Sequence, residues 1–209
     1  MLVGRRLMKT DFNIEFRQVN REFLDMRATL VNDVRTLLDR LTDKDKQVLR
    51  RTVYRAMFAY IEGLVSVLKK EMLLFRKQEG WSPQGKKMQF LTERRETTNR
   101  SGQTVTVAYF APLSRSIPYI FQCYADIHWF EFEVDRTNYG WRCLLEAVNK
   151  RNRITHPKCS QDLVVTNAEI RLLIDGAAWF DNSLRRLFDE CGKACLWRSQ
   201  ALRRSVLEN

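Results

Sequence analysis

Residues 166–191 read TNAEIRLLIDGAAWFDNSLRRLFDEC, and this stretch decides the fold class. Its apolar side chains recur every three or four residues, the spacing that brings them to one side of an α-helix. They are Ile170, Leu173, Ala177, Phe180, Leu184, Leu187 and Cys191. Thr166 and Glu169 form the pattern of a capping box, which satisfies the first free N–H groups of a helix. The stretch therefore predicts a long, capped helix that packs in a bundle.

Two stretches nearer the N-terminus carry the same periodicity. The first, over about residues 10–41, has the stripe Phe12, Phe16, Val19, Phe23, Met26, Leu30, Val34, Leu37 and Leu41. Thr42-Asp43 then reads as a break and a new helix start. The second stripe is Leu49, Val53, Met57, Tyr60, Leu64, Leu68, Met72 and Phe75. With two shorter helices expected at 117–132 and 139–151, the pattern predicts an all-α, antiparallel bundle of four to five helices.

Residues 80–118 interrupt the helical pattern and predict a small β insertion. The opening WSPQG (81–85) is rich in turn residues, and the β-branched run after Asn99–Gly102 favours two short strands around that turn. The insertion contains six basic residues, Lys86, Lys87, Arg94, Arg95, Arg100 and Arg115. They make either a basic arm or, as we favour, a solvated insertion. We expect one domain over 1–209, with this insertion and a basic helical tail at 192–209 that covers the bundle, binds RNA or dimerises.

The charge balance points to an anionic partner. The formal net charge is +11, with a hydrophobic content of 44%. Nucleic acid is the first candidate partner and an acidic membrane surface the second, while a merely solvated basic surface is the alternative. No apolar run reaches the length of a membrane span, and the N-terminus lacks the pattern of a signal peptide. With five cysteines in no secreted spacing, we expect reduced thiols, a cytoplasmic location and no membrane association.

Several kinds of chemistry have no motif in this sequence. It contains no phosphate-binding loop, no Gly-rich dinucleotide turn, no HExxH or CxxC pair and no Gly-x-Ser-x-Gly elbow. Cys191 and Cys195 share a helix face, but they read better as small core residues than as metal ligands. His128 lies among aromatic residues and is expected to be a core histidine. We therefore expect no metal and no cofactor.

Residues 149–158 read NKRNRITHPK and carry four Lys/Arg and no acidic residue. Arg151 and His156 lie five positions apart, about 140° around an ideal helix, so they converge only at a helix end. Pro157 predicts that end, because the residue before a proline is disfavoured in the α region. The stretch thus places a guanidinium on the last helical turn and an imidazole at the helix exit, where both can reach one phosphate.

These residue types suit RNA cleavage without a metal. Arginine keeps its charge and offers donors that match phosphate oxygens, and histidine, with an ordinary pKa of about 6.5, exchanges protons near neutrality. We expect His156 to move a proton at the 2′-hydroxyl or the departing 5′-oxygen, Arg151 to stabilise the pentacoordinate phosphate, and Asn152 to orient one of them. Further expected RNA contacts are Lys150, Arg153 and Lys158. Glu62, in AYIEGL, is either a rim carboxylate that meets an arginine or a supporting site residue.

The motif RNRITHPK resembles the signature of the HEPN superfamily, in which an arginine, usually followed by a polar residue, precedes a histidine by four to six positions. Arg151, Asn152 and His156 match that pattern. The resemblance covers mainly residues 139–188 and implies a helical bundle, commonly a homodimer, whose paired motifs form a metal-independent endoribonuclease site. Many members are toxins or abortive-infection effectors against phage, and others only bind RNA or nucleotides. Lys158 stands where members neutralised by a minimal nucleotidyltransferase carry tyrosine, so the resemblance does not extend to that antitoxin.

Three interpretations remain for the site. The first is an RNA endonuclease acting as a homodimer, as a toxin or phage-defence effector with an antitoxin or regulatory partner. The second is a non-catalytic module that binds RNA or a nucleotide and regulates a neighbouring protein. The third is purely structural, with solvated basic residues and His156 at a helix cap.

Overall fold

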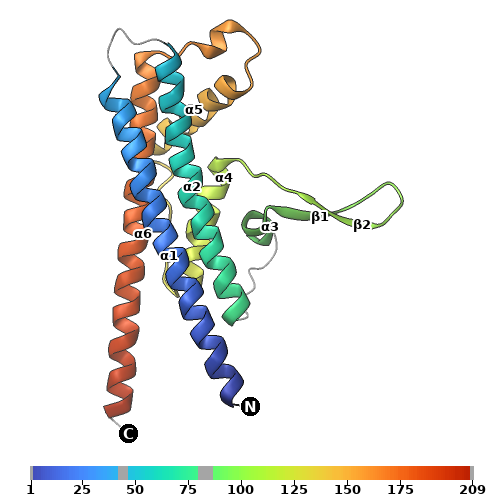
Figure 1. Ribbon diagram of the computed structural model, residues 1–209, viewed down its shortest axis with the longest axis vertical. Coiled ribbons are helices and arrows are strands. Elements are labelled where there is room, and N and C mark those ends of the chain that lie inside the picture. Colours follow the sequence, from blue (N-terminus) through green and yellow to red (C-terminus); the bar gives the residue numbers. More distant parts are fainter. Residues whose placement is uncertain (1, 42–46, 80–86, 208–209) are drawn as a thin grey trace. The chain divides into compact units, whose positions relative to one another are not determined.

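The computed structural model describes residues 2–41, 47–79 and 87–207, and these form six α-helices and one β-hairpin (Figure 1). The elements are α1 (Leu2–Asp39), α2 (Gln47–Glu79), α3 (Lys87–Thr92), β1 (Arg94–Thr98), β2 (Thr104–Ala108), α4 (Leu113–Ile127), α5 (Tyr139–Thr155), the 3-10 turn η1 (Ser160–Leu163) and α6 (Asn167–Leu207). The prediction of an all-α bundle with a small β insertion is confirmed. The chain divides into two compact units, residues 1–71 with 135–182 and residues 72–134 with 183–209.

In the first unit, α1 and α2 lie side by side in opposite directions (Figure 1). Lys70 of α2 donates to Glu22 of α1 at 2.6 Å. Seven residues earlier on α2, a Cβ added at Gly63 would lie 3.0 Å from the sulfur of Met26. Residue numbers therefore rise along one helix as they fall along the other, and the small Gly63 lets the two helices approach closely.

The first part of α6 joins this pair. Asp181 accepts hydrogen bonds from Tyr60 of α2 at 2.7 Å and from Arg27 of α1 at 3.1 Å. Nearer the start of α6, the Tyr54 hydroxyl donates to the Glu169 carbonyl at 2.8 Å. From the Tyr54–Glu169 contact to the Tyr60–Asp181 contact, residue numbers rise along both helices, so α6 runs parallel to α2. Since α2 is antiparallel to α1, α6 is antiparallel to α1 as well.

Helix α5 packs on α6 at unusually short range. A Cβ added at Gly176 of α6 would lie 2.7 Å from the backbone of Leu144, and one added at Gly140 of α5 would lie 2.6 Å from the Cβ of Trp179. The absence of a side chain at each glycine permits this approach, and the two contacts show that α5 and α6 are antiparallel. The indole rings of Trp141 and Trp179 pack beside this close approach, with ring centroids 4.9 Å apart.

Two of the three apolar stripes predicted from the sequence form the core, whereas in the α1 stripe only Val34 is buried and the other members are half-buried. Every member of the α2 stripe from Val53 to Met72 is buried, and so is the α6 stripe from Ile170 to Leu187. Burying each such side chain contributes roughly 1.5–3 kcal/mol relative to exposure, which is why stripe spacing decides the fold. Beyond residue 191, α6 presents no buried side chain up to residue 201.

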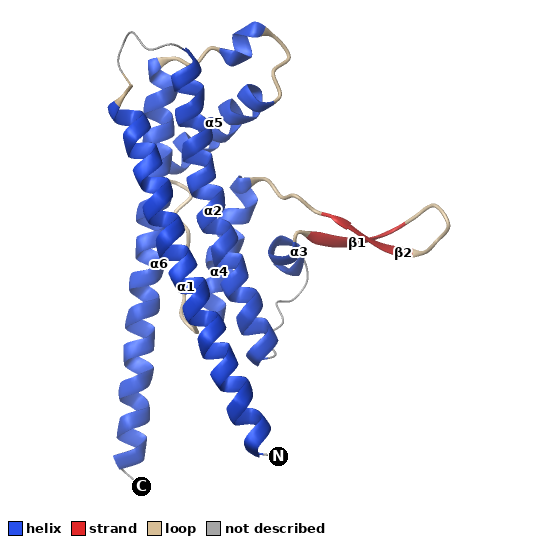
Figure 2. Cartoon of the chain, in the orientation of Figure 1, coloured by secondary structure: helices blue, strands red, loops and turns tan. Residues whose placement is uncertain are grey.

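In the second unit, the hairpin predicted around residues 99–102 is present. Arg94 pairs with Ala108 and Thr98 with Thr104, and Gly102 takes φ +79° in the connecting turn. The strands extend away from α3 and α4 (Figure 2), and β1 is exposed along its whole length. Phe90 of α3 stacks on Tyr119 of α4 at 4.3 Å, which anchors the base of the hairpin.

Several predicted boundaries differ from the structure. Helix α1 begins at Leu2 rather than near residue 10, and the sequence pattern did not predict α3. Helix α4 spans Leu113–Ile127 instead of 117–132, because the backbone closes a turn at residues 128–130. The predicted break at Thr42-Asp43 and the WSPQG turn lie outside the described residues. None of the described helices is long and apolar enough to cross a membrane.

Candidate functional site

The candidate site lies at the C-terminal end of α5, which begins at a sequence-encoded cap. The Asn138 side chain accepts a hydrogen bond from the Gly140 N–H at 2.6 Å. The helix then buries one face against its unit, namely Gly140, Trp141, Cys143, Leu144, Ala147, Lys150 and Ile154. It ends at Thr155, and His156 is its C-cap, as Pro157 predicts. Arg151 therefore lies one turn inside the helix, and the imidazole lies at its exit.

The Arg151 guanidinium is held on three sides. Its Nη2 donates to Glu62 Oε1 of α2 at 2.8 Å, and its Nη1 donates to Asn152 Oδ1 at 3.3 Å. The guanidinium carbon lies 5.8 Å from the centre of the Phe58 ring, within reach of a cation–π contact. The Arg151 side chain is still 34% exposed and that of Glu62 is 42% exposed, so the pair faces solvent. Arginine has five N–H donors, and a positioned, accessible guanidinium of this kind can bind an anion.

His156 is exposed at the end of the same helix. Its backbone N–H donates to the Asn152 carbonyl at 2.9 Å, which fixes the last turn of α5. The Thr155 hydroxyl donates to the Arg151 carbonyl at 2.8 Å and closes the same turn. Within the part of the chain that the structure describes, no hydrogen bond joins the side chains of Arg151 and His156. The imidazole is thus presented to solvent at a rigid helix end.

The loop after His156 is closed by Asp162. Its carboxylate accepts the backbone N–H groups of Lys158 at 2.8 Å and Cys159 at 3.3 Å. The bond from the Lys158 N–H is the main reason that the pKa of Asp162 lies below its ordinary value. Lys158 itself is exposed, so a backbone-fixed turn presents its ammonium to solvent.

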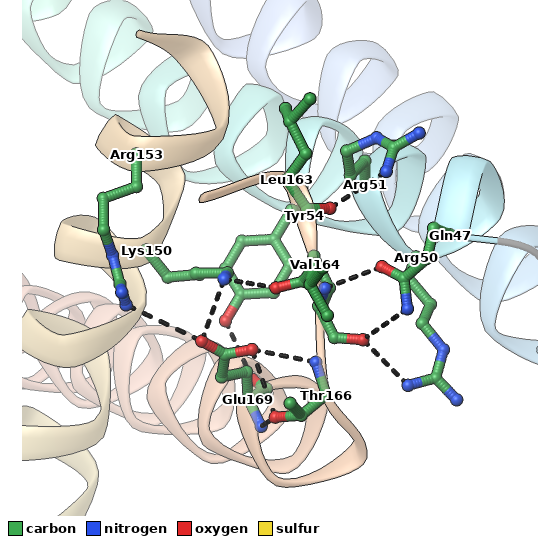
Figure 3. Close-up of polar contacts among 11 residues, drawn as sticks. Gln47, Arg50, Arg51, Tyr54, Lys150, Arg153, Leu163, Val164, Thr166 and Glu169 are labelled. Atoms are coloured by element: carbon green, nitrogen blue, oxygen red, sulfur yellow. Dashed lines mark hydrogen bonds and ion pairs between the residues drawn. The ribbon is translucent and has the colours of Figure 1, made fainter. Parts of the chain in front are cut away.

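Lys150 takes a different place from the one expected of an RNA contact. Only 4% of its side chain is exposed, and its ammonium pairs with Glu169 of α6 at 3.1 Å (Figure 3). It also donates to the Val164 carbonyl. Lys150 therefore joins α5 to the start of α6, and we remove it from the proposed RNA-binding residues.

Glu169 is the acidic centre of this junction. Its Oε2 accepts the Thr166 N–H at 2.8 Å, and the Glu169 N–H donates to the Thr166 hydroxyl at 3.2 Å, which is the capping box expected from the sequence. Burial alone would raise the pKa of Glu169, but the Thr166 N–H and the Lys150 ammonium outweigh burial and leave that pKa lowered. Arg153 approaches the same carboxylate at 3.6 Å and remains 55% exposed, so it stays available to a ligand.

Residues 163–165, which we call the strap, connect η1 to α6 and are held through their backbone (Figure 3). The Leu163 carbonyl accepts from Arg51 at 2.9 Å. The Val165 carbonyl accepts from Arg50 at 2.9 Å and from Gln47 at 3.1 Å, and Gln47 accepts the Val165 N–H in return. Together with the Lys150 bond to the middle carbonyl, these contacts fix the loop that follows His156 to α2 and α5.

The structure thus brings together Arg151, Asn152 and Glu62, and places His156 and Lys158 on the adjoining helix end and loop. Phe58 is part of the arrangement and was not expected, since it is not a member of the predicted α2 stripe and nothing in its neighbourhood in the sequence indicates a contact with arginine. His128, the other histidine, is half-buried and packs on Tyr124 with ring centres 4.4 Å apart.

The described residues contain no group of three or more side chains that could hold a metal ion. The expectation that Cys191 and Cys195 are small core residues is wrong for Cys195, which is exposed, and Cys191 is only half-buried. No family model, curated protein or solved structure matches this chain.

Proposed function

We propose that this chain is a metal-independent endoribonuclease that acts as a homodimer, with Arg151 and His156 catalytic and Asn152 supporting. The observation that carries the proposal is the Arg151 guanidinium, held by Glu62, Asn152 and Phe58 at a helix end that presents an exposed histidine. A fixed guanidinium and an exposed imidazole at one helix end supply the charge stabilisation and the acid–base group that phosphodiester cleavage by the 2′-hydroxyl requires.

The chemistry proceeds by attack of the 2′-oxygen on the adjacent phosphorus. One imidazole accepts the 2′-hydroxyl proton as the P–O bond forms, and a proton is delivered to the 5′-oxygen as the second P–O bond breaks. Arg151 stabilises the negative charge on the non-bridging oxygens in between. The products are a 2′,3′-cyclic phosphate and a 5′-hydroxyl.

The need for two proton transfers supports a homodimer. The chain has two histidines, of which His128 is half-buried against aromatic rings and His156 is exposed. A second copy would supply a second His156, so that one imidazole acts as the base while the other acts as the acid. Arg153 and Lys158 would contact the flanking phosphates.

The test is cleavage of an end-labelled, unstructured RNA in excess EDTA. We expect products with cyclic phosphate ends, and a loss of about 10²–10⁴-fold for His156→Ala and about 10²–10³-fold for Arg151→Ala. The matched control is Arg142→Ala, an exposed arginine on the same helix, which should leave the rate unchanged. Full activity of His156→Ala, or equal cleavage of DNA of the same sequence, would contradict the proposal.

One observation favours a second function. The Arg151 charge is already paired with Glu62, and its side chain makes no bond to His156 among the described residues. This arrangement also suits a non-catalytic module that binds RNA or a nucleotide and regulates a partner. It would show salt-sensitive binding that weakens in Arg151→Ala, with no cleavage of the RNA.

As an effector, the nuclease would act as a toxin or in phage defence, under the control of an antitoxin or another regulatory partner. Induced expression in bacteria should then arrest growth, and the arrest should disappear with His156→Ala. Equal arrest by both forms would separate toxicity from cleavage.

A further inference from the structure

Arg55 is an exposed arginine on α2, the helix that contributes Glu62 and Phe58 to the candidate site. Among the residues that the structure describes, its guanidinium has no hydrogen-bond or ion-pair partner. An arginine carries five N–H donors and keeps its charge at any working pH. The donors of Arg55 are therefore available to a ligand.

Arg55 lies between two α2 residues that contact both ends of the segment after Arg151. Four residues before it, Arg51 donates to the Leu163 carbonyl at 2.9 Å (Figure 3). Three residues after it, Phe58 lies under the Arg151 guanidinium, with 5.8 Å from the guanidinium carbon to the ring centre. Residues three and four apart adjoin on a helix surface. Arg55 is therefore next to the side of α2 along which the chain passes from Arg151, through the helix exit, to Leu163.

Arg55 and Glu62 lie on the same side of α2. They are seven residues apart, which brings the second to within about 20° of the direction of the first after two turns. The α2 residue between them on this side is Ala59, which is exposed and carries only a methyl group. The axial rise from Arg55 to Glu62 is about 10 Å. Because Glu62 holds Arg151, one RNA strand can contact both arginines.

The charge around Arg55 is positive, and the nearby acidic residues are engaged elsewhere. Residues 47–62 and 150–169 contain seven Lys/Arg and three Asp/Glu. The partners of these carboxylates are Arg151 for Glu62, Lys150 for Glu169, and the backbone N–H groups of Lys158 and Cys159 for Asp162. Residues 33–40 of the neighbouring α1 contain two acidic and two basic residues and do not change this balance. No carboxylate of the described chain neutralises Arg55.

We infer that Arg55 binds the phosphate next to the scissile one, while Arg151 binds the scissile phosphate of the same RNA strand. The inference rests on the proposed function and deepens it by naming the substrate class. That class is an RNA chain with at least two successive phosphates, as opposed to a dinucleotide or a free nucleotide. Guanidinium donors match phosphate oxygens in pairs, so a phosphate is the ligand that an unpaired arginine suits best. Arg55 takes no part in proton transfer.

The first experiment measures binding of a single-stranded, 2′-O-methylated oligoribonucleotide, which cannot be cleaved by 2′-oxygen attack. We expect about 5- to 30-fold weaker binding for Arg55→Ala, and partial recovery in Arg55→Lys, which keeps the charge and loses the paired donors. The slope of log affinity against log salt concentration should become shallower by about 0.7, because one phosphate contact is lost.

The matched control for binding is Arg171→Ala. Arg171 is an exposed arginine on α6 in the same unit, turned by about 200° from Glu169 around that helix. Its substitution removes the same charge, and we expect the affinity and the salt slope to stay nearly unchanged. Equal losses for Arg55→Ala and Arg171→Ala would show a general effect of net charge and would overturn the inference.

The second experiment locates the phosphate with an RNA that has a single unmodified 2′-hydroxyl and hence one cleavable linkage. A neutral methylphosphonate at one of the two flanking linkages should lower kcat/KM by the same factor as Arg55→Ala. The same replacement should have no further effect in Arg55→Ala, since the two changes remove one contact. A dinucleotide, which has only the scissile phosphate, should be cleaved equally by both proteins. Multiplied losses at both flanking linkages, or a slower reaction of the dinucleotide, would overturn the inference.

A structural role of Arg55 would give a different result. Alanine is at least as good a helix former as arginine, so the thermal midpoint of Arg55→Ala should stay within about 1 °C of the natural chain. A lower midpoint with an unchanged salt slope would assign Arg55 to the stability of the fold and overturn the inference.

Failure of this inference is distinguishable from failure of the proposed function. If His156→Ala abolishes cleavage while Arg55→Ala retains its affinity and salt slope, the Arg55 contact is wrong and the nuclease stands. If Arg55→Ala weakens binding and makes the slope shallower but the natural chain cleaves no RNA, the Arg55 contact with RNA stands and the nuclease does not.

Discussion

Glu169→Gln should be the most informative test of how the candidate site is held. The Lys150 side chain is 4% exposed and that of Glu169 is 20% exposed, and the ammonium lies 3.1 Å from the carboxylate. Breaking one side of a buried pair costs about 3–5 kcal/mol, since it leaves a charge without its partner. Glutamine keeps an acceptor oxygen, and the carboxylate is partly solvated. We therefore expect a loss of about 2–3 kcal/mol in the free energy of unfolding, or roughly 5–10 °C in the midpoint.

Substituting the other partner of the pair, Lys150, should reduce the free energy of unfolding by less. Lys150→Met removes the buried cation and keeps the length of the side chain, while Glu169 retains the Thr166 N–H and the nearby Arg153. We expect a loss of about 1 kcal/mol, mainly from the Val164 carbonyl that loses its donor. The double variant Lys150→Met/Glu169→Gln should be more stable than Glu169→Gln alone, because no uncompensated buried charge remains.

The assay is urea unfolding followed by circular dichroism. The folded-state pKa of Glu169 is lowered, so its contribution is complete above the unfolded value of about 4.5 and is lost as the pH falls through the folded value. The difference between the natural chain and Glu169→Gln should be full at pH 7 and shrink below about pH 4.5. The control is Glu146→Gln, an exposed carboxylate on α5. If Glu169→Gln and Glu146→Gln reduce the free energy of unfolding equally little, the Lys150–Glu169 pair does not stabilise the fold. The same holds if the difference between the natural chain and Glu169→Gln does not become smaller in acid.

Two further predictions concern packing and buried tyrosines. Gly176→Ala should lower the free energy of unfolding by about 1–3 kcal/mol, because the added Cβ meets the Leu144 backbone. Gly192→Ala on the same helix meets no atom and should raise the free energy of unfolding by about 0.5–1 kcal/mol. Thermal melts compare the two variants, and equal effects would refute the close approach of α5 and α6 at Gly176. Burial raises the pKa of both Tyr54 and Tyr60, so stability should fall as the pH rises above about 10, where unfolded tyrosine ionises. Absorbance at 295 nm should show their phenolates only on unfolding, and a native spectrum with every tyrosine ionised at pH 11 would contradict this.

Periodicity predicted the helices because their stripes are long and nearly uninterrupted. The end of α4 was not predictable in the same way. Helix α4 ends in a Schellman motif, in which the residue after the C-cap has a left-handed backbone and is usually glycine. Here Trp129 occupies that position, with φ +59°. The pattern of apolar residues also continues past the true helix end to Phe132, which is buried in the segment that follows. Apolar spacing reports burial and does not distinguish a helix from a well-packed loop.

The site shows the same division between local and distant information. The helix exit at His156 follows from Pro157, which is adjacent in the chain. We expected Lys150 to be an exposed RNA contact, because a lysine in a basic run suggests a surface residue. Yet it lies three residues after Ala147 and four before Ile154, on the buried face of α5. Its partner Glu169 and the Glu62 partner of Arg151 become visible only once the helices are packed.

The strap has a consequence for how this protein tolerates sequence variation. Arg51, Lys150 and Gln47 recognise three successive carbonyl oxygens of residues 163–165, and no bond among these contacts uses a strap side chain. The identities of Leu163 and Val164, which are not buried, are therefore weakly constrained, while the number of residues is strictly constrained. Inserting one residue would present each donor with the wrong carbonyl and shift the loop that follows His156. In a comprehensive mutational scan, this segment should accept most substitutions at residues 163 and 164 and reject insertions and deletions.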